Sequence, residues 1–112
     1  MKRIDAMVPT LKRSKVVDAI IKAGAGGVTV SEDRGKGSGP RPTFTKARGT
    51  ASYLGEFNRI DTITSIVDDS KVEMIIRTIM GIVHTGDKGD GKIFVSSVEE
   101  SYDISTGQKG KI

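Results

Sequence analysis

The sequence contains no cysteine and a single histidine, His84. Without cysteine the chain cannot form a disulfide, attack a substrate through a thiol or bind a metal through sulfur. One imidazole also argues against a site built from several histidines, so we expect no metal centre.

Aromatic residues and long apolar runs are scarce as well. Only 4% of the 112 residues are aromatic and 36% are apolar, so the core must consist mainly of Val, Ile, Ala and Met. A chain this short is a single domain, over residues 1–112, and such chains often gain stability by oligomerising. No apolar run approaches the roughly 20 residues that cross a bilayer, and the N-terminal stretch is too interrupted for a signal peptide. We therefore expect a cytoplasmic protein.

Acidic residues are absent between Arg34 and Arg48, a stretch that carries five basic residues. One interpretation is a solvated basic loop, and the other is a contact surface for an anionic ligand or partner. The wider region of residues 33–58 has no sustained hydrophobic period and is rich in Gly and Pro. A connection this long in so small a domain is usually functional, or else a sign of wrong element assignment.

Apolar periodicity predicts strands and helices on both sides of this connection. The strands are expected over residues 2–8, 26–33, 57–67 and 92–98, with a short fifth strand over 101–105. The first helix covers residues 12–23 and ends at Gly24. The second helix follows Asp68, Asp69 and Ser70, which are residue types that start helices. Its apolar face consists of Val72, Ile75, Ile76, Ile79, Met80 and Val83.

The order strand, helix, strand, long connection, strand, helix, strand predicts an α+β fold of the ferredoxin-like βαββαβ type. In this fold both helices lie on one face of an antiparallel sheet. The other face is left bare, and partner subunits normally cover such a face. The residues expected there are Thr29, Ser31, Lys92, Phe94 and Ser96.

A glycine-rich stretch, "HTGDKGDGKIFV" over residues 84–95, has nearly the spacing of a phosphate-binding P-loop, G-x-x-x-x-G-K-[ST]. However, Ile93 stands where that motif needs Ser or Thr to hold magnesium, and a helix precedes the loop instead of following it. The carboxyl end of a helix repels anions, so P-loop hydrolysis is excluded. Two interpretations of residues 89–92 remain. They form either a turn in which Asp90 bonds its own backbone, or a nest of N–H groups that holds a phosphate beside a lysine.

The segment "TGDKGDGKIFV", residues 85–95, closely resembles the B-loop signature of the PII signal-transduction proteins, T-G-x-x-G-D-G-K-I-F-V. The resemblance extends over nearly the whole chain. Its other parts are the first strand at "MKRIDAMV", the second strand and T-loop entry at "AGAGGVTVSEDRGKG", the far limb of the T-loop at "ARGT", and the C-terminal strand at "STG".

The resemblance implies a homotrimer with a T-loop over about residues 33–58, a B-loop over about 84–92 and a C-terminal strand or tail over about 101–112. It implies a regulator, not an enzyme, that binds an adenine nucleotide in clefts between subunits. Through its T-loop the protein would regulate partner proteins, such as an ammonium transporter or a nitrogen-assimilation enzyme. The family pattern assigns the phosphates to Gly89, Asp90, Gly91 and Lys92. It assigns the adenosine and ribose side to Thr29, Gly35 and Gly37, and Ser38 completes the nucleotide-binding set.

The C-terminal strand departs from the family pattern R-x-R-T-G, in which both arginines contact the phosphates of the nucleotide. Residues 103–107 of this chain read "DISTG". Charge-assisted hydrogen bonds contribute about 1.5–3 kcal/mol each, so losing two lowers affinity by roughly 10²–10⁴. Lys109 and Lys111 would compensate in part. We therefore expect ADP or AMP rather than ATP as the main ligand. The alternative is a PII-like sensor of AMP, bicarbonate or a cyclic dinucleotide that does not respond to 2-oxoglutarate.

The T-loop departs from the family pattern at two further positions. Gly39 replaces a glutamine that helps to place magnesium and 2-oxoglutarate, and Ser38 replaces the neighbouring arginine. The resemblance therefore implies weak or absent 2-oxoglutarate binding. Arg59, however, stands where the family has a lysine that contacts this acid.

The regulatory part of the T-loop comprises basic residues and candidate modification sites. The basic residues are Arg41, Lys46 and Arg48, and the candidate modification sites are Thr50, Ser52 and Tyr53. The tyrosine modified in many relatives aligns with Ser52, so uridylylation at Tyr53 requires the loop alignment to slip by one residue. Modification of Thr50 or Ser52 is the alternative.

Two other functional classes have less support. A small ferredoxin-like phosphatase would need a nucleophile and a base, and the sequence offers no persuasive pair. Nucleic-acid binding would rest on the basic stretch 34–48 alone, and the scarcity of aromatic residues argues against it.

Overall fold

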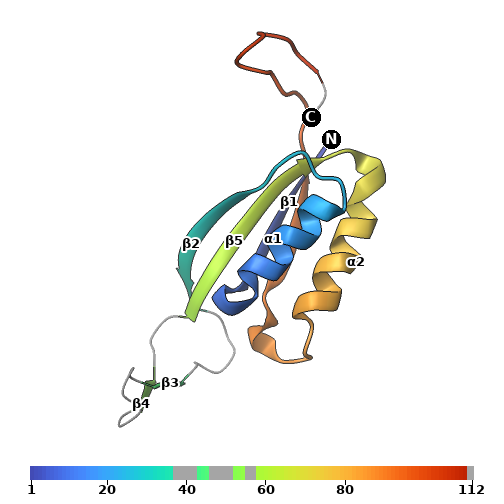
Figure 1. Ribbon diagram of the computed structural model, residues 1–112. Helices are drawn as coiled ribbons and strands as arrows, with labels where there is room; N and C mark the ends of the chain where they lie inside the picture. The colour runs from blue at the N-terminus through green and yellow to red at the C-terminus, as the bar shows by residue number, and fades with distance from the viewer. Residues whose placement is uncertain (37–42, 46–51, 55–57, 111–112) are drawn as a thin grey trace.

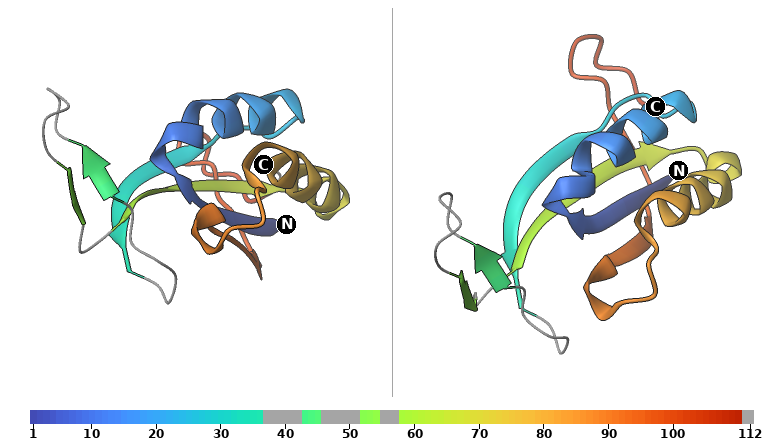
Figure 2. Two further views of the ribbon diagram at one scale, coloured as in Figure 1. Left: turned by 90° about the horizontal axis from the view of Figure 1, so that it is seen from below. Right: turned by 60° about the horizontal axis from the view of Figure 1, so that its bottom comes forward.

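The fold is a four-stranded antiparallel sheet with two helices packed on one of its faces. The computed structural model describes residues 1–36, 43–45, 52–54 and 58–110. Its strands lie in the order β2-β5-β1-β6, and both helices cover the same side of the sheet (Figures 1 and 2). The elements are β1 (Lys2–Pro9), α1 (Arg13–Lys22), β2 (Thr29–Gly35), β5 (Asn58–Val67), α2 (Val72–Val83) and β6 (Lys92–Ser97). The ferredoxin-like arrangement predicted from the sequence is confirmed.

Short elements connect these strands and helices. Single turns of 3-10 helix lead into α1, α2 and β6, and they are η1 (Thr10–Lys12), η2 (Asp69–Lys71) and η3 (Lys88–Asp90). Two short strands, β3 (Thr43–Thr45) and β4 (Ser52–Leu54), pair as an antiparallel hairpin inside the long connection. The sequence pattern missed this hairpin because three residues are too few to show alternation among the surrounding Gly and Pro.

The second strand lies further along the chain than predicted. It begins at Thr29 and continues to Gly35, which pairs with Asn58 at the start of β5. The expected start at residue 26 was wrong because Gly26 and Gly27 have no side chain to pack, and glycine weakens a strand. The long connection therefore leaves the sheet two residues later than predicted.

The core fills the space between the sheet and the helices. Strands β1 and β5 alternate, with every second side chain buried on the helix side, as the period of two predicts. The buried apolar residues are Ile4, Ala6, Val8, Val16, Ile20, Ile63, Val67, Ile75, Ile79 and Val83. Within the described part of the chain, no helix is both long and apolar enough to cross a membrane.

Helix α2 packs through a narrower stripe than the sequence predicts. Ile75, Ile79 and Val83, spaced four residues apart, are buried, whereas Met80 is 48% exposed. Placing Met80 in the core was wrong. It lies one position further round the helix from Ile79, where it borders a hollow near the loop that follows α2.

The face of the sheet opposite the helices carries the residues predicted for it. Met7 alternates with the buried residues of β1, so its side chain lies on the bare face. Met7 pairs with both Lys92 and Thr62, and Thr62 pairs in turn with Ser31, so these residues share that face. The same register places Thr29, Phe94 and Ser96 there. Coverage of this face by partner subunits stays a prediction.

The C-terminal segment does not form the predicted fifth strand. Its strand pairing is limited to one bridge, between Tyr102 and Lys109, and the hairpin they close extends away from the sheet (Figure 1). The prediction over residues 101–105 was wrong because Asp103 folds the chain back. Its carboxylate accepts hydrogen bonds from the amide (2.9 Å) and hydroxyl (2.8 Å) of Ser105, which is a turn geometry.

Candidate functional site

A hollow of about 260 Å³ opens between the end of α2, the loop that follows it, and strands β1 and β6. Met7, Met80 and Ile93 are among its apolar walls. The loop supplies its polar lining, which consists of His84, Gly86, Asp87, Asp90, Gly91 and Lys92. The glycine-rich segment predicted from the sequence therefore borders a concave surface, the usual form of a ligand site.

Asp90 organises this loop. One of its carboxylate oxygens accepts hydrogen bonds from the amides of Thr85 (2.6 Å) and Gly86 (2.9 Å), and the other accepts a bond from the Thr85 hydroxyl. The hydroxyl bond and then the Thr85 amide bond are the main causes that hold the pKa of Asp90 below its ordinary value of 3.8. Asp90 thus folds the loop through its carboxylate, as the turn interpretation predicts. Because this carboxylate is negatively charged, Asp90 does not attract a phosphate itself.

Gly91 lies where no other residue fits. Its φ is +108°, and an ideal Cβ at this position would lie 1.9 Å from the carbonyl oxygen of Met7. Gly89 differs, because a Cβ there would meet nothing within 4 Å. The two glycines of the motif therefore have separate roles. Gly91 allows the loop to approach β1 closely, whereas the space around Gly89 is open.

Lys92 begins β6 directly after this close approach. It pairs with Met7 on the neighbouring strand and is exposed, so its ammonium group is available on the bare face. The P-loop is excluded by the observed order, because α2 ends at Val83 and precedes the loop. The partial negative charge of that helix end disfavours an anion. Among the described residues that line the hollow, Lys92 is the one lysine or arginine that could hold an anion there.

Thr29 and Gly35, predicted on the adenosine side, lie at the opposite edge of the sheet from Lys92. Both belong to β2, which β5 and β1 separate from β6. Three strand spacings of about 4.8 Å each amount to roughly 14 Å. Thr29 is exposed on the bare face, and Gly35 packs so closely on Ile60 that a Cβ would lie 2.7 Å from its Cδ1 atom. One chain does not bring the two halves of the predicted site together.

Most of the predicted T-loop residues lie outside the described residues. This applies to Gly37, Ser38, Gly39, Arg41, Lys46, Arg48 and Thr50. Ser52 and Tyr53 belong to β4, where they pair with Thr45 and Phe44 of β3.

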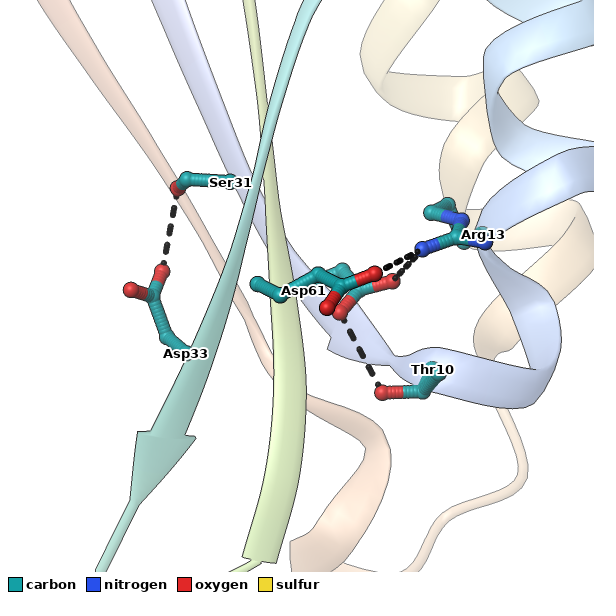
Figure 3. Close-up of polar contacts among 6 residues, drawn as sticks. Thr10, Arg13, Ser31, Asp33 and Asp61 are labelled. Carbon is teal, nitrogen blue, oxygen red and sulfur yellow. Dashed lines mark hydrogen bonds and ion pairs between the residues drawn. The ribbon is translucent and has the colours of Figure 1, made fainter.

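A buried polar cluster at the T-loop end of the sheet was missed by the sequence analysis (Figure 3). Asp61 on β5 is 1% exposed on the helix side. It accepts hydrogen bonds from the Thr10 hydroxyl (3.2 Å) and from Nη1 of Arg13 (3.1 Å), which also bonds Glu32 on β2 (3.0 Å). The signal was present in the sequence. Asp61 lies two residues before buried Ile63, so the strand period places both side chains on the core face. A carboxylate at a core position needs a hydrogen-bonding or charged partner.

A second polar contact joins β2 to β5 on the bare face. The carboxylate of Asp33 accepts a hydrogen bond from the hydroxyl of Ser31 on the same strand (3.1 Å; Figure 3). It accepts another from the hydroxyl of Thr62 on β5 (2.8 Å). Together, the Asp61 cluster and the Asp33 contact hold the two strands that lead into and out of the T-loop.

The C-terminal hairpin presents little positive charge. Within residues 99–110, Lys109 is the one cationic residue, and its ammonium group lies 3.1 Å from the carboxylate of Glu100. Where the family pattern has its first arginine, Asp103 is held in the turn by Ser105, whose hydroxyl bond is the largest cause that lowers the pKa of Asp103. Lys111, the other predicted compensating cation, lies outside the described residues.

Comparison with known proteins assigns the family. The family model described as "Nitrogen regulatory protein P-II" matches residues 1–108. The chain belongs to the P-II family. Proteins named "Nitrogen regulatory protein P-II" from Nostoc punctiforme and Azospirillum brasilense are 39% and 40% identical to it, over 97% and 98% of this chain and 96% of each relative. A "Nitrogen regulatory protein P-II 2" from Methanothermobacter thermautotrophicus is 39% identical over 99% of this chain and 95% of the relative.

Family membership confirms the resemblance found in the glycine-rich segment. This P-II protein belongs to a family of nitrogen regulatory signal-transduction proteins, and it has the ferredoxin-like fold expected of them. After the parts of the family pattern that they resemble, we call the loop of residues 84–92 the B-loop and the connection between β2 and β5 the T-loop.

Proposed function

We propose that this P-II protein forms a homotrimer, binds an adenine nucleotide at the boundary between subunits, and regulates partner proteins through its T-loop. The observation that carries the proposal is the close approach of Gly91 to the Met7 carbonyl, followed at once by Lys92. A loop that requires glycine at that point and presents an ammonium group beside a hollow has the form of a phosphate site.

The B-loop residues suit the phosphate end of a nucleotide. Asp90 holds the turn through Thr85 and Gly86, so the shape of the loop is fixed before a ligand arrives. Gly89 leaves room for close contact with the backbone, and Lys92 supplies the charge. No bond of the nucleotide needs to break, because a ligand regulates by binding one conformation of the protein more tightly than another.

The arrangement of the sheet supports a site between chains. Lys92 and Thr29 lie on opposite edge strands, β6 and β2. When a second copy places its β2 edge beside β6, the phosphate and adenosine halves meet. The bare face is then turned toward partner subunits. In this arrangement Lys92 comes from one subunit and Thr29 comes from its neighbour.

The C-terminal hairpin favours a nucleotide with a short phosphate chain. Asp103 is engaged in its own turn and Lys109 is paired with Glu100, so the hairpin supplies weak compensation for the family's two arginines. We infer a preference for ADP or AMP over ATP. The same observation supports a second candidate, a PII-like sensor with an altered ligand such as bicarbonate or a cyclic dinucleotide. We expect weak or absent 2-oxoglutarate binding, and for the second candidate no response to it, because Ser38 and Gly39 replace the family's arginine and glutamine.

The T-loop is the contact for the regulated protein. Its five basic residues between Arg34 and Arg48, with no acidic residue among them, fit an acidic surface on the partner. By the family pattern this partner is an ammonium transporter or a nitrogen-assimilation enzyme. Modification at Thr50, Ser52 or Tyr53 would alter the charge of that contact.

Isothermal titration calorimetry with ATP, ADP and AMP, each with and without magnesium and 2-oxoglutarate, tests the proposal. We expect saturable binding with the strongest signal for ADP or AMP. Replacing Lys92 with alanine should abolish most of it. Lys88→Ala is the matched control, because Lys88 belongs to the same loop but does not line the hollow.

Absence of binding by every adenylate at millimolar concentration would overturn the nucleotide proposal. Binding of bicarbonate or a cyclic dinucleotide in its place would favour the second candidate. Equal losses in the Lys92 and Lys88 variants would mean that general charge, and not the B-loop site, attracts the ligand.

A further inference from the structure

His84, the only histidine of the chain, lies at the same hollow as Lys92. It follows α2 directly, and 72% of its side chain is exposed. Its Nδ1 atom is 3.8 Å from a carboxylate oxygen of Asp90, which is too far for a hydrogen bond. The imidazole therefore borders the hollow, and among the described residues its ion-pair partner is Asp90, which does not hold it by a hydrogen bond.

The charges around the hollow do not suit an anion when His84 is neutral. Of the described residues that line it, Lys92 carries the one permanent positive charge, against the carboxylates of Asp87 and Asp90. The carboxyl end of α2 adds partial negative charge at Val83. A phosphate would thus meet a site of net negative charge, and a proton on His84 removes that excess.

Asp90 leaves part of the His84 imidazole available to a ligand. The oxygens of Asp90 already accept bonds from Thr85 and Gly86. A protonated His84 has its Nδ1 atom within ion-pair distance of Asp90 and keeps its Nε2–H for a ligand.

We propose that His84 is a ligand-contacting residue, whose protonated imidazole binds the terminal phosphate of the nucleotide beside the Lys92 ammonium group. This rests on the proposed nucleotide site. His84 then gives the phosphate a second cationic contact besides Lys92. The "DISTG" segment of residues 103–107 contains no arginine or lysine that could provide one. Because histidine changes charge between about pH 5 and 8, nucleotide affinity then depends on pH across the physiological range.

Proton NMR of the single histidine gives a direct test. The imidazole C–H resonances of the full-length protein are followed against pH, first alone and then with saturating ADP. If the phosphate contacts the imidazole, linkage requires the titration midpoint of His84 to rise in the presence of ADP. A coupling of about tenfold in affinity corresponds to a rise of about one pH unit. An unchanged midpoint would overturn the assignment.

A variant separates the contribution of the histidine from the titration of the phosphate itself. We expect His84→Gln to lower ADP affinity about tenfold at pH 6, the lower end of the range for a charge-assisted hydrogen bond, and to change it little at pH 8. The ratio of the two proteins' affinities at each pH removes the effect of ligand protonation. Lys88→Gln is the control, with an expected ratio that does not vary with pH.

The outcomes distinguish the role of His84 from the nucleotide site on which it depends. If wild-type protein binds no ADP at either pH, the proposed function fails. If it binds ADP while the His84 midpoint stays fixed and the His84→Gln ratio is independent of pH, the nucleotide site stands and the role of His84 is refuted. A histidine that only supports the loop through Asp90 would alter thermal stability but would give that second result.

Discussion

The carbonyl oxygen of Met7 lies where residue 91 would place a side chain, 1.9 Å from an ideal Cβ on Gly91. The obstacle is backbone on a central strand, so it cannot move aside as the end of a flexible side chain would. Together with a φ of +108°, it explains in physical terms why the B-loop motif has glycine at this position.

Replacing Gly91 with alanine should therefore destabilise the protein and weaken nucleotide binding. The unfavourable φ alone costs about 1–3 kcal/mol, and the contact with Met7 adds to that by pushing the loop away from β1. Chemical denaturation measures the loss of stability. Gly89→Ala is the matched control, because its Cβ meets nothing within 4 Å. Equal stability of the two variants would contradict the close approach.

Asp90 should make the B-loop sensitive to acid. Because its pKa is lowered in the folded protein, the stability it contributes is present above its ordinary value of 3.8 and is lost as the pH falls through that value toward the folded one. Asp90→Asn should remove this dependence and speed hydrogen exchange at the amides of Thr85 and Gly86. The control is Asp87→Asn, whose carboxylate has no hydrogen bond or ion pair with another described residue. Unchanged exchange in the Asp90 variant would refute the role given to its carboxylate.

The Arg13–Asp61 pair should contribute more to stability than an exposed pair. Breaking a buried pair costs about 3–5 kcal/mol, and we expect a value near the lower end because the Arg13 side chain is 36% exposed. Arg13→Met should show this loss in denaturant unfolding. Arg77→Met, which breaks the exposed pair with Glu73, should cost about 0.5 kcal/mol or less.

A double variant tests why the loss occurs. If Arg13→Met destabilises by leaving the Asp61 carboxylate buried without its cation, then adding Asp61→Val should recover much of the stability. Failure to recover would mean that Arg13 acts through its packing and not through its charge.

The C-terminal hairpin offers a gain-of-function prediction. Ser105 stands where the family pattern has its second arginine. Ser105→Arg should keep the turn, because the Asp103 carboxylate accepts a hydrogen bond from the backbone amide of residue 105. Under the proposed function, ATP affinity should rise by about tenfold or more, as one charge-assisted hydrogen bond allows. Calorimetry with ATP measures it. The control is Ile104→Arg, which adds the same charge at a neighbouring side chain that is 99% exposed. An equal gain in both variants would indicate general charge attraction.

Much of the fold was predictable because its signals are local. The alternation of Ile4, Ala6 and Val8 and the four-residue spacing of Ile75, Ile79 and Val83 survive directly as the core. Predictions failed where a single residue departs from what its local pattern indicates. Asp103 turns a segment of strand-like composition into a hairpin, and Met80 fits the helical period yet faces the loop after α2.

The candidate site was predictable in its parts and not in its assembly. The motif identified Gly91 and Lys92, but the reason for the glycine, the carbonyl of Met7, is 84 positions away in the chain. The separation of Lys92 from Thr29 depends on strand order, which no local pattern encodes. His84 also borders the hollow only because the loop after α2 packs against β1. Sequence analysis alone assigned it no role.

The measurement that tests most directly whether the site lies between chains is ADP binding by mixed trimers. One chain type carries Lys92→Ala, and the other carries Thr29→Tyr, which fills the adenosine side; trimers of either type alone should bind no ADP. After the two types are unfolded and refolded together in equal amounts, about one boundary in four combines an intact Lys92 with an intact Thr29 from the neighbouring chain. Calorimetry should then recover about a quarter of the wild-type sites. No recovery in mixed trimers, or a wild-type protein that is monomeric, would contradict a nucleotide site at the subunit boundary.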